Sequence, residues 1–130
     1  MRGRASRAVP PGSSGMTDAP RRGEIYLVTL PGQPRDHKAR PALVVSLDVR
    51  NRLAHDVLVI PLSTTLREAP THVRLEVGEG GLHHASMAKC EQVTTLDKTF
   101  LLRGPFAGTI SLANLAAVER AIMRAIGLVI

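Results

Sequence analysis

The stretch "KARPALVVS", residues 38–46, places two cations and a proline directly before an apolar run that ends in two valines. Such a run favours a strand, and Pro41 suits its first residue, where no ladder hydrogen bond has to be donated. We therefore predict a buried strand from Pro41 onward, with Arg40 directly before its first residue. A guanidinium held at this point would present a planar, permanently charged fork of donors, which suits a phosphate group.

Short β-favouring runs lie on both sides of this segment, separated by polar or turn-forming residues. The alternation of polar and apolar residues in "THVRLEV", residues 71–77, predicts a strand with one buried and one wet face. The polar segment "DVRNR", residues 48–52, predicts a loop. The other predicted strands are residues 24–30, 56–61 and 85–93.

The C-terminal part predicts one amphipathic helix over residues 112–126, with Ser111 as its N-cap and Gly127 just after its end. Its apolar residues recur at three- and four-residue steps and so share one face. We expect this face to pack on the strands. The fold class is therefore mainly β with a C-terminal helix, in a small curled sheet or partly open barrel. The recurring residues are Leu115, Val118, Ile122 and Ile126.

Composition limits the kind of protein this chain can be. Its 130 residues suit one domain. It has no Trp, one Tyr and two Phe, which argues against a sheet that stacks bases on exposed aromatic rings. The single cysteine, the absence of a long apolar span and the lack of a secretory signal favour a cytoplasmic protein.

The N-terminal stretch differs from the rest of the chain. Residues 1–20 are rich in Gly, Pro and Ser and predict a disordered tail, with Met16 as a possible alternative start. Residues 21–130 form the predicted domain. The net charge is +6, and three arginines lie in the first 15 residues, so without them it would be 6 − 3 = +3. The total charge is therefore weak evidence for a polyanionic partner.

Three groups of residues could carry chemistry. The loop before Arg40 contains Arg35, His37 and Lys38, which either keep a surface loop solvated or contact an anion. Three consecutive hydroxyls follow the run that ends at residue 62, and they either cap the next turn or hold phosphate and ribose oxygens. These hydroxyls belong to Ser63, Thr64 and Thr65.

The third group is Lys89, Cys90, Glu91 and Gln92. In an alternating strand Lys89 and Glu91 share one face, where they form a surface pair or face a groove, while Cys90 points into the core. No Cys or His stands at the spacing of a structural zinc site.

Read in order, "RRGEIYLV", "KARPALVVS", "VLVIPLST", "PTHVRL", "AKCEQVTTLDK" and the final "AIGL" closely resemble the MazF/PemK family of toxin endoribonucleases. The resemblance covers residues 21 to about 128. It implies an SH3-like barrel with a C-terminal helix, a fold shared with the CcdB gyrase poisons. It also implies a homodimer that cuts single-stranded RNA without a metal or other cofactor, leaves a 2′,3′-cyclic phosphate and is held inactive by an antitoxin.

The resemblance also assigns roles to residues. Arg40 matches the arginine most often given a catalytic role, Ser63 stands where many members carry a catalytic Thr, and Glu91 matches an acidic position that one branch uses. Lys89 replaces that branch's catalytic Arg. We expect Arg40 to stabilise charge on the phosphorane, with Glu91 or His37 transferring protons. The residues expected to bind RNA are Arg35, His37, Lys38, Thr64, Thr65, Lys89 and Gln92.

An alternative is a non-catalytic member of the same fold that binds RNA or a protein, such as a gyrase poison. Ser63 and Lys89 depart from the familiar catalytic residues, which favours this alternative. The gyrase poisons carry a Trp near the C-terminus, however, and this chain ends "AIGLVI" without one.

Overall fold

The computed structural model of the protein describes residues 18–30 and 39–129. Most of the predicted N-terminal tail lies outside these residues, and so do the candidate site residues Arg35, His37 and Lys38. The predicted domain from residue 21 onward is otherwise covered almost completely.

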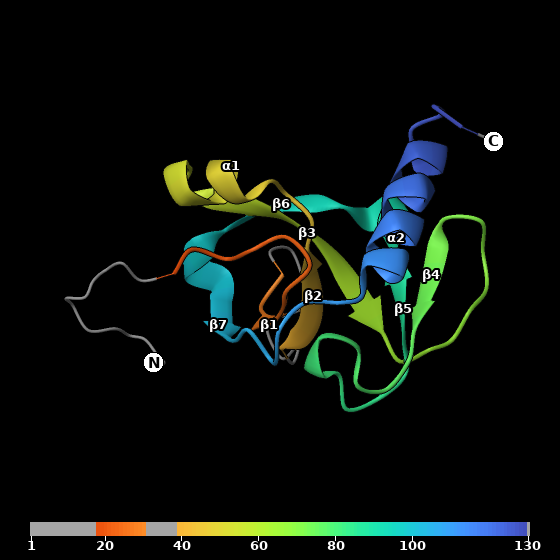
Figure 1. Ribbon diagram of the computed structural model, residues 1–130, viewed down its shortest axis with the longest axis horizontal. Coiled ribbons are helices and arrows are strands. Elements are labelled where there is room, and N and C mark those ends of the chain that lie inside the picture. The colour runs from red at the N-terminus through yellow and green to blue at the C-terminus, as the bar shows by residue number, and fades with distance from the viewer. Residues whose placement is uncertain (1–17, 31–38, 130) are drawn as a thin grey trace.

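One antiparallel sheet dominates the described part of the chain (Figure 1). Its strands follow the order β4-β5-β3-β2-β1-β7, with β6 paired to β3 beside this path. The path ends in two different strands, so the sheet curls without closing, and the predicted partly open, mainly β fold is confirmed. The strands are β1 (Ile25–Val28), β2 (Arg40–Val44), β3 (Asp56–Ser63), β4 (His72–Leu75), β5 (Ser86–Lys89), β6 (Thr94–Asp97) and β7 (Leu101–Arg103).

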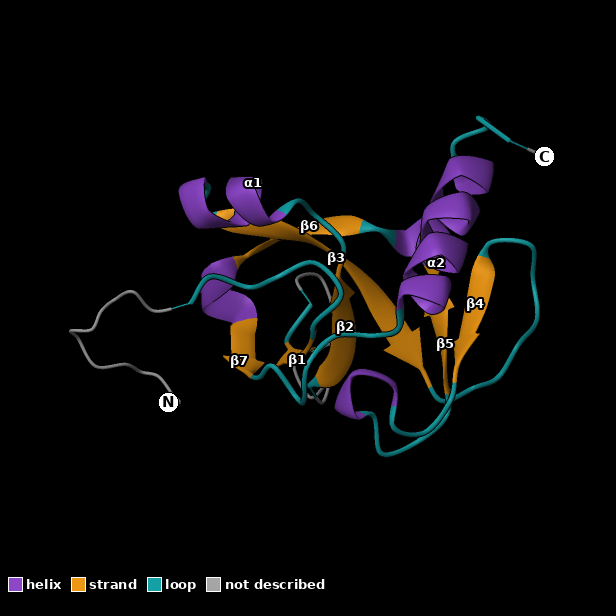
Figure 2. Ribbon diagram, in the orientation of Figure 1, coloured by secondary structure: helices purple, strands orange, loops and turns teal. Residues whose placement is uncertain are grey.

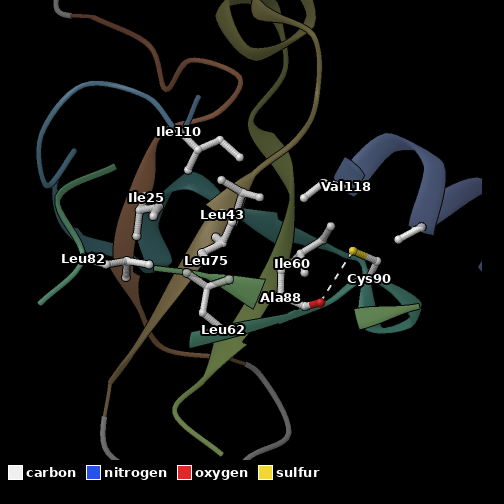
Figure 3. Packing of buried hydrophobic residues seen from close by; sticks show 11 residues of the cluster. Ile25, Leu43, Ile60, Leu62, Leu75, Leu82, Ala88, Cys90, Ile110 and Val118 are labelled. Carbon is white, nitrogen blue, oxygen red and sulfur yellow. Dashed lines mark hydrogen bonds between the residues drawn. The ribbon is translucent and has the colours of Figure 1, made fainter. Parts of the chain in front are cut away.

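Both faces of the central strands are buried, because β2 and β3 consist largely of consecutive apolar residues. Successive side chains in a strand point to opposite faces. Leu43 and Ile60 accordingly lie in one core cluster, while Val44 and Val59 lie in a second. Figure 3 shows the first cluster, in which Val118 of the C-terminal helix approaches the sheet residues. This burial fixes β2 and β3, whose ends carry Arg40 and Ser63.

The C-terminal helix α2 spans Leu112–Ala125, as predicted (Figure 2). The hydroxyl of Ser111 accepts a hydrogen bond from the Asn114 amide at 3.2 Å, which confirms the N-cap. Val118 and Ala121 are buried, and the helix packs against β4 and the 3-10 helix η2 (Cys90–Gln92). The helix therefore supports the two elements that build the candidate site.

The prediction of a loop at residues 48–52 is wrong, because Asp48–Leu53 forms the short helix α1. Tertiary contacts hold this helix. The fully buried Asn51 side chain donates hydrogen bonds to the carbonyls of Pro20 and Ser46, both at 3.0 Å. Pro20 lies 31 residues before Asn51, and this contact is not visible in the polar sequence, which by itself resembles a loop.

The predicted strand over residues 85–93 is also shorter than expected. β5 ends at Lys89, and the chain then enters η2. Cys90 still points into the core, but the strict alternation that placed Lys89 and Glu91 on one strand face does not apply. After β6 the chain forms the 3-10 helix η3 (Lys98–Phe100), which the Asp97 side chain caps by accepting from the Thr99 amide.

In residues 18–30 and 39–129, every helix is too short or too polar to cross a membrane.

Candidate active site

A hollow of about 560 Å³ opens where β4 begins and β5 ends. The segment between β3 and β4 forms one wall, and the start of β4 together with the end of β5 and η2 forms the other. The lining of the hollow is polar and includes two cations, one carboxylate, two hydroxyls and one amide. The lining residues are Thr65, Arg67, Ala69, Thr71, His72, Lys89, Glu91 and Gln92.

Glu91 is held at both carboxylate oxygens. The Thr71 hydroxyl donates to Oε1 at 2.8 Å, and the Nε2 atom of His72 lies 3.1 Å from Oε2. Burial by itself would raise the pKa of Glu91, but the hydrogen bonds from Thr71 and His72 outweigh it, so the pKa lies below the ordinary value. The side chain remains 39% exposed. Glu91 is therefore ionised at neutral pH and accessible from the hollow.

His72 is fixed from both sides of its ring. Its Nδ1 atom lies 2.8 Å from the backbone carbonyl oxygen of Arg67, while Nε2 faces Glu91. Only 6% of the His72 side chain is exposed. The imidazole is thus packed between the β3–β4 segment and η2.

The strand register brings these residues together. The β4–β5 ladder pairs His72 with Lys89, and the 3-10 turn that follows places Glu91 next to the same position. Lys89 and Glu91 consequently line one hollow although they do not lie in one strand. Of the two alternatives for Glu91, a surface pair with Lys89 or a position facing a groove, the structure shows the second.

Ser63 and Arg40 lie at one end of the central sheet, and Ser63 is two residues before Thr65, which lines the hollow. The β3–β5 ladder pairs Ser63 with Met87, two residues before Lys89. The β2–β3 ladder pairs Ala42 with Pro61, so Arg40 and Ser63 each stand two residues beyond that pair on adjacent strands. Arg40 is exposed. Neither residue is among those that line the hollow.

Among the described residues, the structure thus gathers four predicted residues in the hollow, while Arg40, Ser63 and Thr64 are not part of its lining. Thr64 is exposed in the turn after β3. The Ser63 hydroxyl accepts from the Thr65 amide at 3.1 Å, as the capping alternative predicts, and this bond leaves the hydroxyl's own hydrogen for a further acceptor. The predicted residues that line the hollow are Thr65, Lys89, Glu91 and Gln92.

Sequence reasoning missed Arg67, Thr71 and His72. The alternating pattern of residues 71–77 puts His72 on the polar face of its strand, but nothing in that pattern points to Glu91, which lies 19 residues further on. Within the described ranges, no group of three His, Cys, Asp or Glu side chains is placed to hold a metal ion.

Cys90 lies beside the hollow but behaves as a core residue. It is fully buried. Burial raises the pKa of its thiol to about 12, and the charge of Glu91 adds to this effect. Since the thiolate is the reactive form, Cys90 is inert at neutral pH, as the sequence predicted.

The fold and the site define a small, mainly β protein with a polar hollow suited to a phosphate-containing ligand, because cations, hydroxyls and one carboxylate converge there. Residues 21–126 match the model of the PemK-like, MazF-like toxins of type II toxin-antitoxin systems. The chain belongs to this family.

Individual relatives agree with this assignment. Endoribonuclease MazF1 of Mycobacterium bovis is 31% identical, over 85% of this chain and 96% of its own length. Endoribonuclease EndoA of Bacillus subtilis is 29% identical, over 60% of this chain and 71% of its own length. A mycobacterial endoribonuclease solved in complex with its cognate antitoxin is 31% identical, with a TM-score of 0.71 over 86% of this chain and 99% of that chain.

Proposed function

We propose that this MazF-family toxin is a metal-independent endoribonuclease that cuts single-stranded RNA by attack of the 2′-hydroxyl on the neighbouring phosphate. One arrangement carries the proposal. An ionised carboxylate, Glu91, shares a hollow with Lys89 and two hydroxyls. Ser63 stands two residues before the lining residue Thr65, at the sheet end where Arg40 begins the neighbouring strand β2.

The reaction needs three contributions. Glu91 accepts the proton of the 2′-hydroxyl, whose oxygen forms a bond to phosphorus. Arg40 stabilises the negative charge of the phosphorane with donors that are already in place. The bond from phosphorus to the 5′-oxygen then breaks, and Lys89 gives this oxygen a proton. The products are a 2′,3′-cyclic phosphate and a 5′-hydroxyl, so no water is consumed.

We take Glu91 as the proton acceptor, because it is the candidate whose surroundings the structure describes. Glu91 lies in the hollow with a lowered pKa, so it is ready to accept a proton at neutral pH. Arg40 is better suited to hold charge than to move protons, because a guanidinium stays protonated in proteins. In this scheme Ser63 and Thr65 supply hydroxyls toward the phosphate or ribose.

The purified full-length chain should cut a mixed single-stranded RNA in the presence of EDTA. Mass spectrometry of the fragments should find 2′,3′-cyclic phosphate at the new 3′ ends. Intact RNA under these conditions, with the protein folded by circular dichroism, would contradict the proposed activity. A growth defect on induction in cells without cleaved RNA would instead favour the protein-binding alternative, and a gyrase supercoiling assay would then test that alternative directly.

We further propose that the chain acts as a homodimer in the cytoplasm and that an acidic, partly disordered antitoxin covers the hollow. The cations Arg67 and Lys89 in the hollow support an acidic partner. Light scattering at micromolar concentration should give the mass of a dimer, and the cognate antitoxin should block cleavage when it is added in equal amount. A stable monomer would contradict the first proposal. Recovery with the membrane fraction of cells would contradict the cytoplasmic location.

A further inference from the structure

His72 makes two contacts that together determine where its protons lie. The carbonyl oxygen of Arg67, 2.8 Å from Nδ1, can only accept a hydrogen bond. Nδ1 must therefore carry a hydrogen. The remaining question is whether Nε2, which faces Glu91 at 3.1 Å, is also protonated.

An ionised carboxylate is an acceptor at both oxygens. Oε1 of Glu91 already accepts from the Thr71 hydroxyl, so Oε2 needs a donor as well. A neutral His72 with its hydrogen on Nδ1 would turn a lone pair toward Oε2, which is repulsive. The contact is satisfied only when a proton lies between the two groups.

We infer that His72 is a positioning residue, protonated on both ring nitrogens, that holds the carboxylate of Glu91 by a charged hydrogen bond and orients it toward the hollow. This inference rests on the proposed function, in which Glu91 accepts the proton of the 2′-hydroxyl. His72 and Thr71 each contact one carboxylate oxygen, so both oxygens of Glu91 are held in place by hydrogen bonds. With 39% of its side chain exposed, Glu91 still presents lone pairs to a ligand.

The surroundings make Glu91 the natural partner of a charged His72. The β3–β4 segment contributes Arg67 to the hollow and β5 contributes Lys89, while Arg124 of α2 reaches the Pro70 carbonyl at 3.4 Å. These groups are all cations. Glu91 is the one acidic residue among the described residues that line the hollow, so an imidazolium there depends on Glu91 for its compensating charge.

Nitrogen-15 NMR of the histidine rings tests the protonation state without RNA. In the full chain at pH 7, both ring nitrogens of His72, assigned from the signal that His72→Gln removes, should have the shifts of protonated imidazole. In Glu91→Gln the amide can donate to Nε2, so this nitrogen should lose its proton while Nδ1 keeps its own. An unprotonated Nε2 in the wild-type protein would overturn the inference.

RNA cleavage against pH tests the positioning role. His72→Gln keeps a hydrogen-bond donor but removes the charge, so the acid limb of the kcat/KM profile should move up by about one to two pH units. At pH 7 the kcat/KM of His72→Gln should be about 10- to 100-fold below that of the wild type, because Glu91 is misplaced. The matched control is His83→Gln, an exposed histidine outside the hollow. An unmoved acid limb with kcat/KM equal to that of the control would overturn the inference.

The two proposals fail in different ways. If the wild-type chain cuts RNA and His72→Gln behaves like the control, the positioning role is wrong and the proposed function stands. If the wild-type chain cuts no RNA, the proposed function is wrong, and the positioning role that rests on it is overturned with it, whatever the ring protonation measured by NMR.

Discussion

Arg40→Ala should lower RNA cleavage by at least about 10²-fold, the loss that follows removal of one preorganised donor to a developing oxyanion. Arg40 is the first residue of β2, and the following residues of that strand are buried in both core clusters. Its backbone is thereby fixed, which in the proposed mechanism limits how far the guanidinium can move from the phosphorane. Cleavage of a labelled single-stranded RNA in EDTA, under single-turnover conditions, measures the effect.

Two variants make this result specific. Arg40→Lys keeps the positive charge but loses the planar fork, so it should fall between the wild type and Arg40→Ala. Arg120→Ala removes an exposed arginine from α2, away from the hollow, and should retain full activity. All three proteins should give the wild-type circular-dichroism spectrum. Full cleavage by Arg40→Ala would remove Arg40 from the mechanism.

Glu91→Gln should lower kcat/KM by about 10²- to 10⁴-fold, the usual contribution of a general base. Glutamine has nearly the same shape and can still accept from the Thr71 hydroxyl, so the loss reflects the proton acceptor and not the packing. The exposed Glu68, in the segment between β3 and β4 but outside the hollow, provides a matched control as Glu68→Gln.

The pH dependence of the wild-type enzyme follows from the lowered pKa of Glu91. A carboxylate with a depressed pKa stays ionised to lower pH than an ordinary glutamate. Activity should therefore persist on the acid side and decline only as the pH falls through this depressed value. The residual activity of Glu91→Gln should lack this acid limb. An unchanged acid limb in the variant would assign the proton transfer to another group, with His37 the next to test.

Local patterns in the sequence predicted most of the fold. The period of apolar residues identified α2, and the Ser111 side chain caps it as expected. The central strands were evident because runs such as "VLVIPL" are buried on both faces and need no particular partner to be recognised. In contrast, α1 was missed, because its buried Asn51 donates a hydrogen bond to Pro20, which lies 31 residues away and cannot be linked to this segment from the local sequence.

In the candidate site, too, some features followed from the local sequence and others from contacts between separate segments. The position of Arg40 at the start of a strand followed from the neighbouring proline and the apolar run after it. Lys89 and Glu91 were identified as candidates, but their common hollow results from η2, where a strand had been predicted.

By itself the sequence determined where the central strands and α2 lie, because these features depend on contacts between near neighbours in the chain. Only the tertiary structure joined His72 to Glu91 across 19 residues. Their contact depends on the β4–β5 register and on the turn after Lys89. Such a register is decided by packing over the whole sheet and cannot be seen in either segment alone.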